Sequence, residues 1–144
     1  MRYSRRFTPA ANAGFTLIEL LVVMVILVML AGLVGPRVLQ YLATSRAKAA
    51  RIQIEAIATS LEMFKLDVGR YPSTAEGLQA LVAAPGGLDG WGGPYLKNGQ
   101  LPIDPWGNVY VYRKPGERTE FEIISFGADR QPGGTGEAAD VKNW

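Results

Sequence analysis

The stretch that decides the fold is Gly14-Phe15-Thr16-Leu17-Ile18-Glu19, because a long apolar run begins inside it. From Leu20 to Gly35 the chain carries no charged side chain. Together with residues 15–18, the apolar stretch is about 20 residues long, which lets a helix span roughly 30 Å of hydrocarbon. The sequence therefore predicts a transmembrane helix over residues 15–36, with one acid, Glu19, near its start.

Residues 1–14 are interpreted as a leader peptide. This segment carries Arg2, Arg5 and Arg6 but no acid. It differs from a secretory signal peptide, because no small-residue cleavage site follows the apolar run. If the leader is cleaved, the bond between Gly14 and Phe15 is the better candidate, and the apolar helix then stays attached to the chain.

Composition excludes several classes of chemistry. The chain has 15 Lys and Arg residues against 13 Asp and Glu residues. Subtracting the three arginines of the leader leaves 12 basic residues, so the remaining chain has a charge near −1 and no basic excess that favours nucleic acid. Cysteine and histidine are absent, which excludes cysteine nucleophiles, histidine general bases and the usual zinc ligands.

Residues 37–68 predict an amphipathic helix beyond Pro36, where the lost hydrogen bond and the nearby Gly32 and Gly35 favour a kink. Apolar residues recur there at alternating steps of three and four. The C-terminal half of this stripe is expected to pack on strands, and its alanine-rich first half to meet neighbouring helices. The stripe consists of Ala43, Ala47, Ala50, Ile54, Ile57, Leu61, Phe64 and Val68.

The rest of the chain predicts short elements. Ser73 or Thr74 is expected to cap a helix over residues 76–83. Residues 85–108 predict an ordered loop held by three buried aromatic side chains, and strands are expected over 109–113 and 120–125. The fold class is therefore α+β, with a long N-terminal transmembrane and amphipathic helix packed on a small antiparallel sheet. The three aromatic residues are Trp91, Tyr95 and Trp106.

Glu19 is expected to have a partner, because a carboxylate at the centre of a membrane helix costs about 2.5–3.5 kcal/mol. One interpretation is a carboxylate at the helix edge that reaches the lipid headgroups. The other begins with cleavage after Gly14, which leaves a charged amine on Phe15, four residues before Glu19 and on the same helix face. A pair of opposite charges costs far less in lipid than either charge alone.

The C-terminal tail contains the candidate metal site. Asp129 and Asp140 bracket the stretch Gly133-Gly134-Thr135-Gly136. Such a loop can fold around a hard cation, with backbone carbonyls and water as further ligands. A loop that is merely solvated is the alternative, and spacing alone does not decide between them. Residues 104–108, Asp-Pro-Trp-Gly-Asn, are interpreted as a turn.

Five motifs, spread over nearly the whole chain, occur together: 14–19 (GFTLIE), Pro36, 71–78 (YPSTAEGL), 101–108 (LPIDPWGN) and 125–129 (SFGAD). With them the chain resembles the major pseudopilin family of the bacterial type II secretion system, within the type IV pilin-like superfamily. The motif at 14–19 is shared by all type IV pilin-like proteins, whereas the motifs at 101–108 and 125–129 narrow the resemblance to the major pseudopilin.

The resemblance implies a type IV pilin-like fold with no enzymatic activity. It implies that prepilin peptidase cuts after Gly14, that Phe15 is then N-methylated, and that Glu19 pairs with the amine of a neighbouring subunit. Pro36 stands at the helix-breaking position of the family, where we expect local unwinding in a filament.

The resemblance also implies a place in the cell. We expect a single-pass protein of the bacterial inner membrane, with residues 37–144 in the periplasm. It would polymerise into a pseudopilus, together with minor pseudopilins and an inner-membrane secretion platform, and drive export of folded proteins across the outer membrane. No phosphate-binding loop is present in the sequence, so a cytoplasmic ATPase would supply the energy.

Calcium is the cofactor that the resemblance implies, bound at the C-terminal loop. Carried over by position, its ligands are Asp129, Asp140, the carbonyl of Phe126 and an oxygen near Thr135. The loop departs from acid-richer relatives at Arg130 and at 135–136, and Glu137 is an alternative ligand. Calcium would stabilise an exported domain that has no disulfide bond.

Three alternatives remain open at this point. A type IV pilin, or a competence pseudopilin that binds DNA, is disfavoured because pilins often carry a C-terminal disulfide loop and DNA binding favours a basic stripe. A monomeric membrane-anchored calcium-binding module leaves Glu19 without a role. An enzyme built on Asp104, Asp129 and Asp140 lacks a neighbouring nucleophile and any group that orients these acids.

Overall fold

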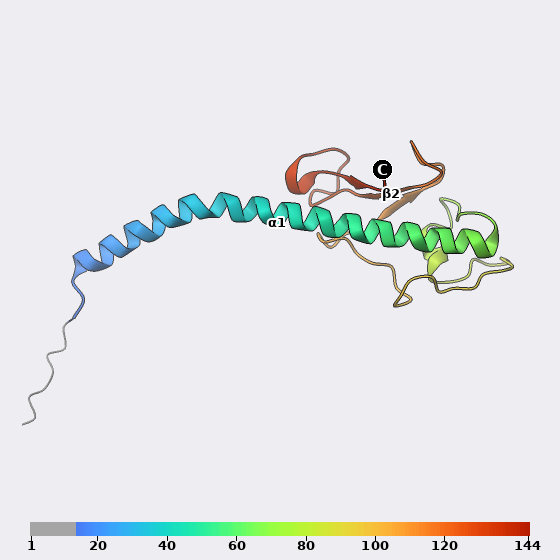
Figure 1. The fold of residues 1–144 in the computed structure, drawn as a ribbon, viewed down its shortest axis with the longest axis horizontal. Coiled ribbons are helices and arrows are strands. Elements are labelled where there is room, and N and C mark those ends of the chain that lie inside the picture. The colour runs from blue at the N-terminus through green and yellow to red at the C-terminus, as the bar shows by residue number, and fades with distance from the viewer. Residues whose placement is uncertain (1–13) are drawn as a thin grey trace, which may run out of the picture. The chain divides into compact units, whose positions relative to one another are not determined.

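The structure, a computed structural model, describes residues 14–144, and its contacts divide the chain into two units. One unit ends at Val38, and the other runs from Leu39 to Trp144. One long helix and a single three-stranded sheet make the fold α+β, as predicted (Figure 1). In chain order the elements are helix α1 (Leu17–Val68), the 3-10 helix η1 (Leu78–Leu81), strands β1 (Val111–Arg113) and β2 (Glu122–Ser125), the 3-10 helix η2 (Gly136–Ala138) and strand β3 (Val141–Lys142).

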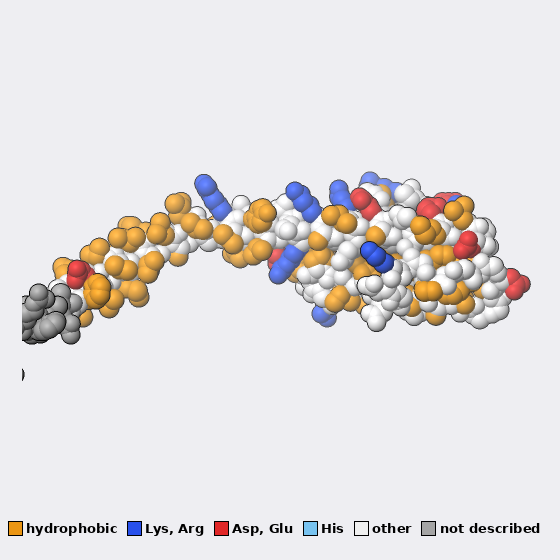
Figure 2. Space-filling model, turned by 60° about the horizontal axis from the view of Figure 1, so that its bottom comes forward, with side chains coloured by type: hydrophobic (Ala, Val, Ile, Leu, Met, Phe, Trp, Pro, Cys, Tyr) orange, Lys and Arg blue, Asp and Glu red, His pale blue; other side chains and the backbone are white. Residues whose placement is uncertain are grey.

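The first unit leaves its apolar side chains uncovered. Every large apolar side chain from Phe15 to Val38 is exposed, and Phe15 is 91% exposed (Figure 2). Within residues 14–144, α1 is the one helix that is long and apolar enough to cross a membrane. It remains helical through Pro36, so this proline does not end the helix in a single chain. Unwinding at Pro36 inside a filament stays a prediction.

The second unit is built on the predicted apolar stripe of α1. The stripe is buried in the core from Ala50 to Phe64, while Ala47 and Val68 are partly buried on either side. Contact of its alanine-rich first half with neighbouring helices stays a prediction. The helix ends at Gly69, which has a φ of +83° and donates its N–H to the Lys65 carbonyl at 2.8 Å. A glycine accepts this left-handed conformation without strain. The fully buried residues of the stripe are Ala50, Ile54, Ile57, Leu61 and Phe64.

Strand β2 is the centre of the sheet and pairs antiparallel with β1 and with β3. Both predicted strands form, but each begins two residues later than expected. Val109 is 76% exposed and makes only an isolated bridge with Ile103. Strand β3 was not predicted, because two residues are too few to show an alternating pattern.

The predicted helix over residues 76–83 is wrong in length, since only η1 forms. Ser73 does cap the turn that lies just before η1. Its Oγ accepts the N–H of Glu76 at 3.2 Å, and the Glu76 carboxylate accepts the N–H of Ser73 at 2.7 Å. This reciprocal pair is a capping box. Gly77 follows with φ 60° and ψ −165°, which is not helical, so the turn cannot continue into an α-helix.

The loop over residues 85–108 is ordered by aromatic side chains, as predicted, although they are partly rather than fully buried. Trp91 donates its indole N–H to the Ala80 carbonyl at 2.8 Å, and the Tyr95 hydroxyl donates to Asp67 at 2.9 Å. The Tyr95 ring packs edge-on against Phe64, with centroids 5.7 Å apart. These contacts fasten the loop to the C-terminal half of α1, on the side away from the sheet (Figure 1).

Replacing Glu76 by Gln should destabilise the fold at neutral pH but not at pH 2. The Arg70 guanidinium, 2.7 Å away, and the Ser73 N–H lower the pKa of Glu76 from 4.5 to about 2. A lowered pKa stabilises the fold above the unfolded value, and that stabilisation is lost as pH falls from about 4.5 to 2. We expect a loss of about 1 kcal/mol at pH 7, measured by thermal unfolding of the full chain in detergent. An equal loss at pH 2 would contradict the assignment.

Candidate functional sites

The start of α1 is closed by a capping box that we had not predicted. The Glu19 carboxylate accepts the Thr16 N–H at 3.0 Å and the Thr16 hydroxyl at 3.1 Å, while Thr16 Oγ1 accepts the Glu19 N–H at 3.3 Å. The signal was present in the sequence, because Thr16 and Glu19 have the spacing of a capping box. In the uncleaved chain, therefore, Glu19 already satisfies two donors of its own helix end.

Cleavage between Gly14 and Phe15 would change the charge at this site. Both residues are exposed and lie outside α1. Residues 1–13 of the predicted leader lie outside the described residues. A free amine on Phe15 would begin the chain one residue before Thr16, so Glu19 would have a cation as a second possible partner.

The C-terminal loop is closed by the pairing of β2 with β3. Ser125 of β2 pairs with Val141 of β3. Phe126 follows Ser125 and Asp140 precedes Val141, so the two ends of the loop lie at the same end of the sheet. Ala128 also donates its N–H to the Glu137 carbonyl at 2.8 Å. Two of the four predicted calcium ligands are thus brought together by a strand that sequence analysis missed.

The two carboxylates of the loop hold backbone groups at its turns. Asp140 Oδ2 accepts the Gly133 N–H at 3.0 Å, and the Asp140 N–H returns a bond to the Gly133 carbonyl at 3.2 Å. Asp129 Oδ1 accepts the Gln131 N–H at 3.1 Å. Thr135 is exposed, and its hydroxyl makes no hydrogen bond within residues 14–144.

One oxygen in this loop lacks a partner. Asp140 Oδ1 is buried and has no hydrogen-bond donor within the described residues. A buried carboxylate oxygen without a donor is costly, and a bound cation satisfies it. The residues present therefore suit a hard cation. However, the described residues contain no group of three acidic, histidine or cysteine side chains around such a site, so backbone carbonyls and water would complete the six to eight ligands of calcium.

Glu137 is engaged elsewhere. Its two carboxylate oxygens lie 3.0 and 3.2 Å from the Arg46 guanidinium of α1. Pairing with Arg46 directs this carboxylate to the helix, so it is not available as the alternative ligand. The ion pair ties the loop to the part of α1 just before the buried stripe.

Asp104 organises the turn that precedes β1, and its role was underestimated from the sequence. It is 3% exposed and accepts three hydrogen bonds, from the N–H groups of Trp106 (3.0 Å) and Asn108 (2.7 Å) and from the Ser125 hydroxyl (2.6 Å). The Asn108 amide then donates to the Gly127 carbonyl at 2.9 Å. The turn therefore supports the first residues of the C-terminal loop, on either side of Phe126.

Gly127 must be glycine at this position. Its φ is +61°, and a Cβ there would lie 2.5 Å from the Glu137 carbonyl oxygen. The close approach lets residues 126–128 lie against 137–139, which brings the two ends of the loop together. Asp104 and Asp140 are held in different hydrogen-bond networks, the first with Ser125 and the second with Gly133.

Comparison with known families matches both parts of the chain. Residues 37–144 match the family model described as type II secretion system (T2SS), protein G. Residues 9–35 match the model described as prokaryotic N-terminal methylation motif.

Individual relatives agree with the family models. The type II secretion system core protein G of Pseudomonas aeruginosa is 47% identical over 141 residues, covering 92% of this chain and 95% of that protein. The core protein G of Vibrio cholerae is 42% identical, covering 92% of each chain. The crystal structure of the major pseudopilin from the type 2 secretion system of enterohaemorrhagic Escherichia coli superposes with a TM-score of 0.58. It is 31% identical and covers 70% of this chain and 88% of that chain.

Replacing Asp104 by Ala should destabilise the second unit by about 3 kcal/mol or more, because it leaves two N–H groups and a hydroxyl without their acceptor. Thermal unfolding of the full chain in detergent measures the effect. Replacing Asp89, an exposed acid in the loop over residues 85–108, by Ala is the matched control and should change stability by less than about 0.5 kcal/mol. Equal effects of the two substitutions would contradict the supporting role of Asp104.

Proposed function

We propose that this chain, which belongs to the type II secretion system protein G family, is a structural, non-catalytic subunit of a type II secretion pseudopilus. The observation that carries the proposal is the uncovered apolar surface from Phe15 to Val38, in a chain whose remaining residues match protein G. Such a surface is stable in lipid or against other apolar helices, but not in water. A subunit that leaves the membrane must therefore exchange lipid for neighbouring helices.

The proposed sequence of events begins in the inner membrane. Prepilin peptidase cuts between Gly14 and Phe15, the new amine is methylated, and residues 37–144 lie in the periplasm. The match of residues 9–35 to an N-terminal methylation motif supports this step. Subunits then polymerise through α1 into a filament, with minor pseudopilins and the inner-membrane platform as further partners, and the growing filament drives export of folded proteins.

Glu19 is the proposed assembly residue. In a single chain its carboxylate caps its own helix. In the filament it would pair with the amine of Phe15 on a neighbouring subunit, and this pairing satisfies two charges that are each costly in an apolar environment. Assembly thereby provides a partner for a group that lipid cannot solvate.

Calcium is the proposed cofactor of the C-terminal loop. Asp129, Asp140, the Phe126 carbonyl and an oxygen of Thr135 would hold it. The support is the unpaired buried oxygen of Asp140 and the closure of the loop by β3. A cation held there would join the two ends of the loop and stabilise the folded state, as a disulfide bond does in other exported domains.

Other functions are less well supported. A type IV pilin or competence pseudopilin does not account for the match to protein G over residues 37–144. A monomeric calcium-binding anchor gives no role to the carboxylate of Glu19.

Removing calcium should lower the melting temperature of the full chain in detergent by several degrees. Binding to the folded state alone adds about 2.7 kcal/mol at one hundred times the dissociation constant. In the Asp140→Asn variant, which keeps an oxygen for the Gly133 N–H, the melting temperature should no longer respond to calcium or to EDTA. The Asp89→Asn control should behave as the parent does. An unchanged parental melt in EDTA would overturn the calcium proposal.

Replacing Glu19 by Gln should abolish filaments seen by electron microscopy of cells that overproduce the chain. Thr16→Val is the matched control, because it removes a hydroxyl of the capping box but keeps the carboxylate, and it should still assemble. Mass spectrometry first verifies that the mature chain begins at a methylated Phe15 in each variant. Normal filaments from Glu19→Gln would contradict the pairing, and loss in both variants would mean that Glu19 acts only as a helix cap.

A further inference from the structure

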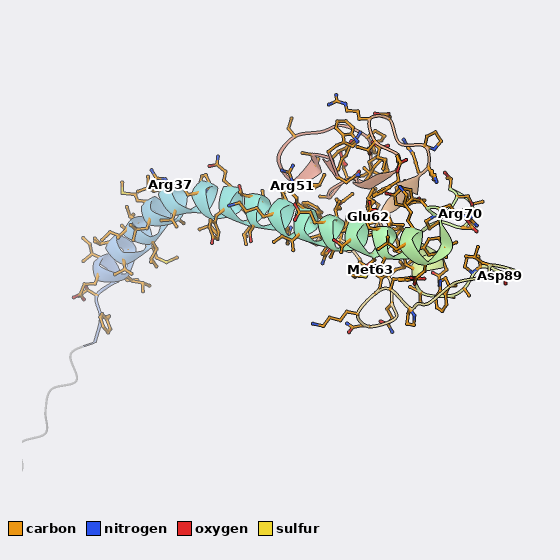
Figure 3. All side chains as sticks on the ribbon, turned by 45° about the vertical axis from the view of Figure 1, so that its right-hand side comes forward. Arg37, Arg51, Glu62, Met63, Arg70 and Asp89 are labelled. Atoms are coloured by element: carbon orange, nitrogen blue, oxygen red, sulfur yellow. The ribbon has the colours of Figure 1, made fainter. Side chains whose placement is uncertain are left out.

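The sheet has a second face, which is directed away from α1. Tyr112, Ile123 and Val141 belong to the core, and side chains alternate along a strand, so the residues next to them lie on the opposite side. The sheet lies along one side of α1 in Figure 3, and this outer face is the side away from the helix. The outer face consists of Val109, Val111, Arg113, Glu122, Ile124, Phe126, Lys142 and Trp144.

One end of the outer face is apolar and uncovered. Val109 is 76% exposed, and Ile103, which forms an antiparallel bridge with it, is 60% exposed. An open pocket of about 390 Å³ lies at this apolar end, with a volume in the range of small-ligand pockets. Exposed apolar side chains around such a hollow are typical of a binding site. The pocket is lined by Gly107, Asn108, Val109, Val111, Phe126 and Arg130.

The arginine of this pocket has a strained backbone. Arg130 has a φ of +60°, the only positive φ of a non-glycine residue within residues 14–144. This conformation costs free energy for a residue with a side chain, and glycine avoids that cost. Nothing inside the chain offsets it, because among the described residues the Arg130 guanidinium makes no hydrogen bond and no ion pair. Strain at an otherwise unused side chain points to a partner outside the chain.

The other end of the outer face is basic. Glu122 is fully buried there, and its Oε1 lies 3.4 Å from Lys142 Nζ and accepts the Trp144 indole N–H at 3.2 Å. The Arg118 guanidinium covers the Trp144 ring, 3.9 Å from the ring centroid. No carboxylate of the described residues lies within 4.0 Å of Arg118. An arginine without an acidic partner therefore stands at each end of the outer face.

We propose that the outer face binds an acidic segment of another periplasmic protein. An apolar side chain of that segment enters the pocket beside Val109, and a neighbouring carboxylate pairs with Arg130. Acids further along the segment meet Arg118 at the basic end. From Val109 to Arg113 the face is about 13 Å long, which is the length of four residues of an extended segment. The proposal rests on the pseudopilus function above, under which this unit lies in the periplasm, and adds a partner surface to it.

An acidic protein segment suits this face better than a lipid surface or a second copy does. Anionic lipid is recognised by clusters of about four to eight basic residues, whereas Arg118 and Arg130 are the two arginines of this face that lack an acidic partner among the described residues. If subunits polymerise through α1, the side of the sheet away from α1 is left for a different protein. Its free positive charges and its apolar pocket then require a partner that carries both carboxylates and an apolar side chain.

Binding of a fluorescent peptide to the full chain in detergent tests the proposal, with fluorescence anisotropy as the measurement. The probe is an acidic peptide with a central leucine, Glu-Asp-Leu-Glu-Asp. One matched peptide has Gln and Asn in place of the acids, and the other has Ser in place of leucine. Both should bind at least about tenfold more weakly than the probe. No binding of the probe, or equal binding of all three peptides, would overturn the proposal.

The Arg130→Gly variant separates a binding role from a structural one. Glycine relaxes the backbone at this φ, so the melting temperature should stay the same or rise and should still respond to calcium. Binding of the probe should nevertheless fall at least about tenfold. Lys48→Gln removes an exposed charge from α1 and is the matched control, with binding expected to stay within about twofold. Equal losses in the two variants would mean an unspecific attraction between charges and would overturn the site.

An environment-sensitive label distinguishes a protein partner from lipid. The chain has no cysteine, so Ile103→Cys can be labelled with bimane beside the pocket and placed in vesicles that contain phosphatidylglycerol. The emission should shift to shorter wavelength only when the probe peptide is added. A shift without the peptide, seen in phosphatidylglycerol but not in phosphatidylcholine, would mean a lipid contact and would overturn the choice of occupant.

Filament assembly separates this proposal from the pseudopilus function. Cells that overproduce Arg130→Gly should form filaments like those of the parent, because the outer face is not used in the contact through α1. Loss of filaments at an unchanged melting temperature would mean that the face meets another copy, and would overturn the choice of a different protein. No filaments from the parent, together with normal binding of the probe, would instead contradict the pseudopilus function alone.

Discussion

The burial of one face of α1 is the interaction on which the second unit depends. Its three strands are two to four residues long, and a sheet so small is not stable in water unless something covers it. Ile54, Ile57, Leu61 and Phe64 supply the cover and are fully buried. Each buried side chain of this size contributes about 1.5–3 kcal/mol. The buried face of α1 is therefore the surface on which the rest of the core packs.

The same helix differs in its surface along its length. Its first part presents apolar side chains on every side, which suits lipid. Its second part has one face in the core, one charged flank and one exposed apolar row. This division explains why α1 is amphipathic only beyond Pro36.

The C-terminal loop depends on the sheet in turn. Asp104 fixes the turn before β1 and reaches Ser125 at the end of β2, and Asn108 holds Gly127. β3 then closes the loop just beyond Asp140. The loop is exposed through most of its length and has no disulfide bond, so its conformation rests on these few hydrogen bonds. A cation at the unpaired oxygen of Asp140 would add the missing restraint at the point where both ends meet.

The sequence by itself determined the elements whose signals are periodic or repeated over many residues. The apolar run, the amphipathic stripe and the α+β class all follow from such patterns, and Glu19 stood out because one acid beside an apolar run is costly. The turn at residues 104–108 was recognised from local chemistry, although its support of the C-terminal loop was not.

Tertiary structure decided the features that depend on residues far apart in the chain. Strand β3 has two residues and no pattern of its own, so only its pairing with β2 reveals it. The shortened helix at η1 reflects the backbone angles of Gly77. Glu137 has the right charge and position for a metal ligand, but Arg46, 91 residues earlier, binds it. The order of residues along the chain cannot show such a pairing, because only the folded structure brings distant groups within reach of the same carboxylate.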